Sequence, residues 1–363
     1  MWVTSSLNTA QGPTAIALGN FDGIHLGHRQ VIAPVLRSQN LSLLQEWQPS
    51  GVSPVAEQST SQIWGYSSWQ LGQPQTATVA PDLSVTSYFA TVLTFFPHPK
   101  EYFSGRPRSL LTPLEEKAFQ LKQMGIDQLV LLPFNQALAQ LSAEAFVEQI
   151  LIDQLQAQHI SVGVDFRFGY QRAGTAALLK EVCDRHQVPV TIVPLKCING
   201  ETRISSSSIR QALQTGDLAR VKQRLGRPYS LTGTVVAGQR LGRTIGFPTA
   251  NLKLPEEKFI PRRGVYSVWV YGIADSAMTP HLGVMNIGVR PTVDGNAETV
   301  EVHLLDWSGN LYGQRLTVML TAFLRPEQQF NGLDQLKAQI RLDCDRARQW
   351  QPMVEPQSSG SSQ

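Results

Sequence analysis

The chain contains 363 residues, of which 42% are hydrophobic and 16% are charged. This length favours two domains over a single hydrophobic core, and the apolar content is sufficient for each half to fold. The formal net charge of +3 is too small to indicate a general nucleic-acid or membrane surface. We therefore expect neither a nucleic acid nor a membrane as a partner, whereas small anionic ligands remain compatible with the composition.

Two features of the sequence indicate the cellular compartment. Its first residues, MWVTSSLNTAQG, lack the basic start and apolar run of a signal peptide, and no apolar stretch reaches 18 residues. The three cysteines, Cys183, Cys197 and Cys344, stand far apart and form no CxxC pair, which suits a reducing environment. We expect a cytoplasmic protein in which all three cysteines are packing residues.

The first half of the chain, residues 1–226, alternates short apolar runs with helix-like segments. Val, Ile and Leu dominate the runs, as buried parallel strands require. We expect strands at Thr14–Asn20, Ala90–Phe96, Ile126–Leu132, Ile160–Asp165 and Pro189–Leu195. This βα repetition predicts an α/β domain with a Rossmann-like parallel sheet.

Local signals place one helix of this domain. Thr112 is expected to cap it, with Pro113 at its first position and Glu115 completing a capping box. Gly125 is expected to end it.

A stretch from 45 to 90 interrupts the βα pattern. It is rich in Gln, Ser, Pro and Thr and carries scattered aromatic residues, among them Trp47, Trp64 and Trp69. Such a composition buries too little apolar surface to offset the entropy of ordering. We interpret it as a flexible insertion, with docking of its aromatic residues on the domain or on a partner as the alternative.

The second half, residues 227–352, changes to strands and turns. We expect strands at Leu231–Val236, Gly264–Tyr271, His281–Gly288, Thr299–Leu305 and Leu316–Leu324, which predicts an antiparallel β-barrel. A last helix is expected over Leu333–Trp350, capped by Asn331. Its apolar stripe should close one side of the barrel; the stripe consists of Leu333, Leu336, Ile340, Cys344 and Ala347. Residues 353–363 are expected to fray.

The run GNFDGIHLGH, Gly19–His28, stands at a strand-to-helix turn. Backbone N–H groups and the helix dipole favour phosphate at such a turn. Gly27, between His25 and His28, lets the backbone approach a triphosphate while both imidazoles donate hydrogen bonds to it. One histidine alone is more often structural, but two in this glycine-containing turn indicate a nucleotide site.

Together with a second element, RISSSSIR at Arg203–Arg210, this run resembles the signatures of the HxGH nucleotidyltransferases. TFFPHP (Thr94–Pro99), LLTPLEEK (Leu110–Lys117) and VGVDFRFG (Val162–Gly169) narrow the resemblance to bacterial bifunctional riboflavin kinase and FMN adenylyltransferase proteins, the FAD synthetases. The resemblance implies that residues of the first half hold ATP and its phosphates, namely Gly19, Phe21, Asp22, Gly23, His25, His28, Asp165, Arg203, Ser206, Ser207 and Arg210. Two residues depart from the family's pattern: Phe96 stands where an acidic residue is common, and Ser207 replaces a threonine.

The chemistry of such a site can be reasoned from its nucleophile. The phosphate monoester of FMN has a second pKa of about 6, so its oxygen is already nucleophilic near neutral pH and needs no protein base. The reaction needs in-line positioning and neutralisation of charge on the α-phosphate and the departing pyrophosphate, which imidazoles, arginines and Mg²⁺ supply.

A second glycine-rich segment, AGQRLGRTIGFPTAN at Ala237–Asn251, is no P-loop because GxxxxGK[ST] is absent. Gly238, Gly242 and Gly246 fit hairpin turns and a phosphate cradle equally well. GFPTAN resembles the riboflavin kinase signature, which implies that its threonine and asparagine, Thr249 and Asn251, help to coordinate Mg²⁺ on ATP.

Two further segments, NIGVRPT at Asn286–Thr292 and VEVHLLD at Val300–Asp306, complete the kinase resemblance and add Arg290 to the expected ligand-binding residues. Glu301 on an alternating strand would ordinarily face solvent. Riboflavin's terminal ribityl group, however, is an alcohol that benefits from a carboxylate accepting its proton during attack on the γ-phosphate. Glu301 matches the family's catalytic glutamate.

The resemblance implies riboflavin, FMN, FAD and ATP as ligands, with ATP as co-substrate, Mg²⁺ as cofactor and no tightly bound redox cofactor. Two alternatives stay open at this point. One is another HxGH transferase or a class I aminoacyl-tRNA synthetase, although no basic tRNA-binding domain is evident. The other is a non-catalytic C-terminal barrel of OB-like character, which leaves Glu301 and the PTAN segment unexplained.

Overall fold

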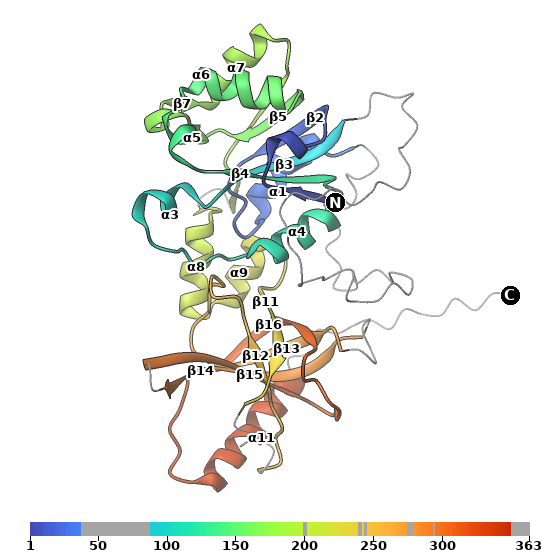
Figure 1. Cartoon of the computed structure of the whole chain (residues 1–363). Helices are drawn as coiled ribbons and strands as arrows, with labels where there is room; N and C mark the ends of the chain where they lie inside the picture. Colours follow the sequence, from blue (N-terminus) through green and yellow to red (C-terminus); the bar gives the residue numbers. More distant parts are fainter. Residues whose placement is uncertain are drawn as a thin grey trace, which may run out of the picture. The chain divides into compact units, whose positions relative to one another are not determined.

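The computed structural model describes residues 1–37, 88–198, 202–238, 242, 245–273, 279–292 and 295–349. The chain divides into two compact units: Met1–Ser208 with Arg224–Gly226, and Ile209–Gln223 with Arg227–Gln363 (Figure 1). The expected insertion at 45–90 lies almost entirely outside the described residues, as does the tail at 353–363.

The first unit is built on a six-stranded sheet in the order β1-β4-β3-β2-β5-β8. Every neighbouring pair is parallel, which confirms the predicted α/β class. The strands are β1 (Trp2–Thr4), β2 (Thr14–Leu18), β3 (Phe89–Phe96), β4 (Gln128–Pro133), β5 (Ala157–Gly163) and β8 (Val190–Val193). Strand β1 was not predicted, because its three residues are too few to form a recognisable apolar run.

Alternate residues of the central strand β2 face two separate apolar cores. Ile16 and Leu18 pack into one core with α6 (Ala143–Ala145), the π-helical segment η4 (Phe146–Gln154) and α7 (Ala176–Arg185). Ala15 and Ala17 pack into the other with α1 (Leu26–Ile32) and α4 (Leu114–Gln123). Figure 1 shows these helices on the two faces of the sheet. The first unit also contains α3 (Pro99–Ser104) and α5 (Gln136–Gln140), and most residues of α8 (Ser206–Thr215) and α9 (Leu218–Leu225) belong to the second unit.

The start of α4 differs from the prediction. The helix begins at Leu114 with Pro113 at the cap position and no side-chain cap. The Thr112 hydroxyl accepts a hydrogen bond from the Gly23 backbone N–H at 2.9 Å. The expected cap by Thr112 is therefore wrong, because this hydroxyl serves a turn 89 residues away. The helix ends before Gly125, whose φ of 84° suits glycine.

The second unit contains a closed antiparallel barrel in the order β11-β12-β15-β14-β13-β16, as predicted. Its strands are β11 (Ser230–Val236), β12 (Ala250–Lys253), β13 (Gly264–Tyr271), β14 (His281–Thr292), β15 (Gly295–Leu304) and β16 (Arg315–Arg325). Strand β12 was missed because its four residues directly follow the glycine-rich segment and resemble its continuation.

Helix α11 (Leu333–Gln349) packs its apolar stripe on the barrel, as expected. Cys344 and Ala347 are buried with Val265 and Val284, and Ile340 packs against them. Two details of this expectation are wrong. Leu333, at the first turn, is 55% exposed, and the helix begins one residue after Gly332, so Asn331 does not cap it.

The cysteines fit the expected packing role in part. Cys183 and Cys344 are buried, but Cys197 is exposed because it lies in the short hairpin of β9 (Cys197–Ile198) and β10 (Thr202–Arg203). No helix among the described residues is both long and apolar enough to span a bilayer.

Candidate active sites

A cavity of about 770 Å³ opens where the strands of the N-terminal sheet end. Gly19, Phe95 and Gly163, at the carboxyl ends of β2, β3 and β5, are among the residues that line it. The order of the strands reverses here, because β3 and β5 lie on opposite sides of β2. Open parallel sheets bind their ligands at such a switch point.

The two histidines of the GNFDGIHLGH run meet at the start of α1. His25 is the N-cap residue, and its Nδ1 accepts a hydrogen bond from the His28 backbone N–H at 3.2 Å. The two rings are stacked, with centroids 3.6 Å apart, and both line the cavity. A Cβ at Gly27 would lie 3.2 Å from Cε1 of His25, so glycine leaves room for the stacked ring. Phe21, edge-on to His28 at 5.3 Å, completes this wall.

Asp22 and Gly23 fix the shape of the turn. The Asp22 carboxylate is buried and accepts the Leu111 and Thr112 backbone N–H groups at 2.8 and 3.3 Å. The Asp22 carbonyl accepts a hydrogen bond from the Ser206 hydroxyl at 2.8 Å. Gly23 has a φ of 92° and does not line the cavity. These contacts tie the first motif to both the 111–112 segment and the second motif.

The second motif reaches the cavity through part of its length. Arg203 forms an ion pair with Asp165, and both side chains are about half exposed at the cavity wall. Ser206 and Ser207 open helix α8 there and line the same wall. Arg210 does not line it: its guanidinium lies over the Phe259 ring, 5.7 Å from the centroid.

Sequence reasoning missed a polar group after β3. His98 caps helix α3, with its Nδ1 accepting the Lys100 N–H and its Nε2 3.2 Å from the Arg108 guanidinium. Glu101 ties both ends of this group together by accepting the His98 and Arg108 backbone N–H groups. Burial and the Arg108 charge lower the pKa of His98 to about 4, so this imidazole is neutral. His98, Lys100 and Arg108 line the cavity; a histidine before Pro99 at a helix start was the available signal.

Of the two residues that depart from the family's pattern, Ser207 lines this cavity and Phe96 does not. Phe96 is 57% exposed and is not among the lining residues. Its neighbour Phe95 lines the cavity together with Phe103 and Phe134, and Phe134 lies edge-on to both rings. One side of the cavity is therefore aromatic.

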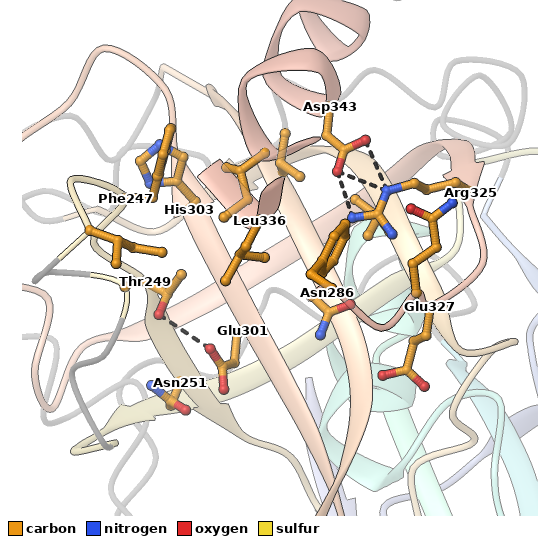
Figure 2. Close-up of a pocket in the computed structure, with 17 residues that line it drawn as sticks. Phe247, Thr249, Asn251, Asn286, Glu301, His303, Arg325, Glu327, Leu336 and Asp343 are labelled. Atoms are coloured by element: carbon orange, nitrogen blue, oxygen red, sulfur yellow. Dashed lines mark hydrogen bonds and ion pairs between the residues drawn. The ribbon is translucent and has the colours of Figure 1, made fainter. Parts of the chain in front are cut away.

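A second cavity, of about 340 Å³, lies in the barrel unit (Figure 2). Glu301 on β15 faces Asn251 on β12 and Asn286 on β14 across the two neighbouring ladders. All three side chains line the cavity. The Thr249 hydroxyl donates a hydrogen bond to Oε2 of Glu301 at 3.3 Å. The barrel therefore gathers a carboxylate, two amides and a hydroxyl in one row.

The glycines of the second segment differ in what they do. A Cβ at Gly238 would collide with the Asn251 amide, and one at Gly242 would collide with the Phe247 carbonyl. Gly242 also accepts the Phe247 N–H at 2.8 Å, which closes the turn before the PTAN residues. Gly246 has a φ of 89° and lies outside this cavity, and the side chain of Arg290 lies outside the described part of the chain.

Two more groups of this cavity were not predicted. His303, two residues after Glu301, has its Nδ1 2.8 Å from the Pro248 carbonyl and its ring edge-on to Phe247. Arg325 and Asp343 form an ion pair in the wall. Neither residue belongs to a segment that carried the resemblance, so only the closed barrel reveals the pair.

Comparison with known proteins assigns each cavity to a family segment. The FAD synthetase family model matches residues 7–45 and 80–208, and the riboflavin kinase model matches residues 225–351. The bifunctional riboflavin kinase/FMN adenylyltransferase of Escherichia coli K12 is 36% identical over 356 residues, covering 96% of this chain and 97% of that protein. The chain belongs to the bifunctional riboflavin kinase/FMN adenylyltransferase family. The protein of that name from Bacillus subtilis is 33% identical, covering 93% of this chain and 92% of its own length.

A solved structure resembles this chain in fold over almost its whole length. A crystal structure described as a macrolide-efflux protein from Streptococcus pneumoniae matches with a TM-score of 0.73 and 27% identity, covering 96% of this chain and 99% of that chain. In this chain the segment that matches the FAD synthetase model precedes the segment that matches the riboflavin kinase model. The histidine cavity therefore lies in the FAD synthetase segment, and the Glu301 cavity lies in the kinase segment.

Proposed function

We propose that the chain phosphorylates riboflavin to FMN in the barrel cavity and adenylylates FMN to FAD in the N-terminal cavity, with ATP as co-substrate of both reactions. The observation that carries this proposal is that each family segment has its own cavity, and that the two contain different chemistry. A carboxylate stands among polar side chains in one, and imidazoles and arginines gather at a helix start in the other.

In the kinase reaction, the carboxylate of Glu301 accepts the proton of riboflavin's terminal ribityl hydroxyl. The resulting oxygen forms a bond to the γ-phosphorus of ATP as the bond to the β,γ-bridging oxygen breaks, which yields FMN and ADP. The hydrogen bond from Thr249 holds one carboxylate oxygen of Glu301 at the cavity wall. Asn251 and Asn286 flank Glu301 in the strand register and line the same cavity.

The side chains of Thr249 and Asn251 suit their expected role as magnesium ligands. They offer a hydroxyl and an amide oxygen beside a carboxylate, which are the oxygen donors that Mg²⁺ prefers, and Gly238 leaves room for the amide. Mg²⁺ is commonly held by a few protein oxygen atoms together with substrate phosphates, and here the phosphates would come from ATP. The ion would neutralise charge on those phosphates. Gly242 shapes the adjoining turn. For Gly246 and Arg290, a role in ligand binding depends on the family resemblance alone.

In the adenylyltransferase reaction, a phosphate oxygen of FMN attacks the α-phosphorus of ATP and pyrophosphate leaves. His25 and His28, which line the cavity, would donate hydrogen bonds to the triphosphate, and Arg203 would supply positive charge. Ser206 and Ser207 add hydroxyls at the start of α8, where the helix dipole favours anions. The N–H groups after Gly19 and Phe21 lie in the same turn, while Asp22 and Gly23 hold its shape.

Asp165 and Arg210 differ in their position relative to the cavity. Asp165 lies at the cavity wall and orients Arg203 through their ion pair. Arg210 does not line the cavity, so its role in phosphate binding depends on the family resemblance alone.

One time course tests both reactions. The full chain is incubated with riboflavin and MgATP, and riboflavin, FMN and FAD are separated over time. We expect FMN to rise first and FAD to follow at its expense, and chelation of Mg²⁺ to stop both. Absence of FMN would reject the kinase assignment, and absence of FAD from supplied FMN would reject the adenylyltransferase assignment.

A further inference from the structure

The wall of the kinase cavity contains a buried ion pair. Arg325, the last residue of β16, binds Asp343 on α11 through Nη2 and Oδ2 at 2.8 Å. Its Nε also donates to both carboxylate oxygens, at 3.0 and 2.9 Å. The Arg325 side chain is 11% exposed and that of Asp343 is 2% exposed, so the carboxylate has almost no contact with water. Gln339 donates a further hydrogen bond to Asp343 at 2.9 Å.

The guanidinium retains donors after these bonds are counted. A guanidinium has five N–H groups. Nε and one N–H of Nη2 serve Asp343, and one N–H of Nη1 serves the Pro326 carbonyl at 3.0 Å. Within the described residues this leaves one N–H on each terminal nitrogen without a partner. Because Arg325 lines the cavity, these two donors are available to a ligand there.

The cavity has charged groups on two sides, and both polar residues, among them Asn286 and Glu327, and apolar residues line it between and around them. Figure 2 shows Glu301 and the Arg325–Asp343 pair on opposite sides, with Leu336 between them. Val265, Val284 and Ile340 add to the apolar lining. Riboflavin likewise has polar groups on two sides of a flat apolar ring: an alcohol at the end of the ribityl chain, and carbonyl oxygens on the far edge of that ring.

We propose that Arg325, oriented by Asp343, recognises the carbonyl edge of the riboflavin ring. Arg325 is then a specificity-determining residue that touches the substrate, and Asp343 is a positioning residue that acts through it. This inference depends on the proposed kinase function, because the hydroxyl end of riboflavin must lie at Glu301 for the ring to reach Arg325.

The charge balance of the pair suits this role. The ring of riboflavin is uncharged, so an isolated arginine in this wall would be desolvated without gaining a counter-ion. Asp343 supplies that counter-ion from within the protein, and the pair presents two directed N–H donors with no net charge. Fixing the planar guanidinium in advance also lowers the entropy lost when a ligand binds.

The direct test compares oxygen with sulfur at the ring carbonyls. Initial rates of phosphorylation by the full chain are measured with riboflavin and with analogues whose C2 or C4 carbonyl oxygen is replaced by sulfur, a weaker hydrogen-bond acceptor. We expect at least one analogue to lose about 10- to 100-fold in kcat/KM, mainly through KM, as for loss of one hydrogen bond to a charged donor. Equal kcat/KM for riboflavin and both analogues would overturn the inference while leaving the kinase function intact.

Variants of Arg325 and Asp343 test whether this ion pair causes the preference for oxygen over sulfur. Arg325→Lys keeps the charge but loses the fork, and the double variant Arg325→Met/Asp343→Leu replaces the whole pair by apolar groups, a change that buried pairs often tolerate. In both we expect a riboflavin KM raised about 10- to 100-fold with kcat changed far less, and no remaining preference for oxygen over sulfur. A kcat near the parent value shows that the barrel is folded, and FAD formation from supplied FMN shows that the N-terminal unit is folded.

Asp334→Asn is the matched control, because Asp334 is an exposed carboxylate on the same helix. It should keep both the riboflavin KM and the preference for oxygen. If the double variant still prefers oxygen, or if kcat falls while KM stays, the pair only supports the barrel and the inference is wrong. If the chain phosphorylates neither riboflavin nor an analogue, the kinase function itself is wrong.

Discussion

Replacing Glu301 by glutamine tests the chemistry of the kinase cavity most directly. Glu301 lies between Asn251 and Asn286 in the strand register, and its Oε2 accepts the Thr249 hydroxyl at 3.3 Å. Glutamine has almost the same volume, and its amide oxygen still accepts a hydrogen bond from Thr249. Glu301→Gln therefore keeps the row of polar side chains and removes the basic carboxylate alone.

The size of the loss follows from the role of the carboxylate. General-base catalysis contributes about 10²- to 10⁴-fold, equivalent to about 3 to 5 kcal/mol of the barrel cavity's transition-state stabilisation. We expect phosphorylation of riboflavin by Glu301→Gln to slow by that factor under single-turnover conditions. Adenylylation of FMN should stay near the parent rate, because the phosphate nucleophile needs no proton acceptor.

Rapid quenching after mixing enzyme with riboflavin and MgATP measures the chemical step itself. Glu298→Gln is the matched control, since Glu298 stands on the same strand, is 45% exposed and pairs with Arg263 at the surface. It should keep the parent rate. A parent-like single-turnover rate in Glu301→Gln would refute the reasoning, because an ordinary strand glutamate would then occupy this position and the base would be another group.

Three further predictions concern the other residues of the two cavities. His28→Ala should lower FAD formation from FMN by about 10² to 10³, the scale of one lost transition-state donor, while riboflavin phosphorylation survives; loss of both activities in a folded variant would contradict the assignment. Gly238→Ala should lower kinase kcat/KM by about 10- to 100-fold, because the new methyl group displaces the Asn251 amide, and unchanged MgATP kinetics would show that this amide takes no part. Because the pKa of His98 is lowered to about 4, the unfolded chain takes up this proton more readily, so the free energy of unfolding should fall as the pH drops from 6.5 towards 4; thermal melts of His98→Gln, whose amide keeps the helix cap, should lack this part of the decrease.

The fold could be predicted because each unit repeats a strong hydrophobic period. Long apolar runs gave the central strands of the sheet, and alternating residues gave the barrel. Two strands of the main sheet and the barrel were missed, Trp2–Thr4 and Ala250–Lys253, which have three and four residues, less than one recognisable period. They form because neighbouring strands offer unpaired backbone groups, a condition that local sequence does not contain.

Some residues of the candidate sites could likewise be predicted from local sequence, and others could not. His25 with His28, and Thr249 with Asn251, stand within a few residues of each other, so a local motif was enough to bring them to notice. Thr112 shows the opposite case. Its place before a proline satisfied every local rule for a helix cap, yet its hydroxyl accepts a hydrogen bond from Gly23, 89 residues earlier.

Arg325 and Asp343 mark the limit of what the sequence could reveal. A basic residue at the end of a strand and an acidic residue on a helix are ordinarily solvated, and that interpretation holds until α11 covers the barrel. Once the helix is in place the Asp343 side chain is 2% exposed, and removing either partner alone would leave an uncompensated charge in the wall. Burial by a helix distant in sequence thus changes two ordinary surface charges into a fixed ion pair whose guanidinium faces the cavity that also contains Glu301. Such a group can be recognised only once the helix is seen packed on the barrel.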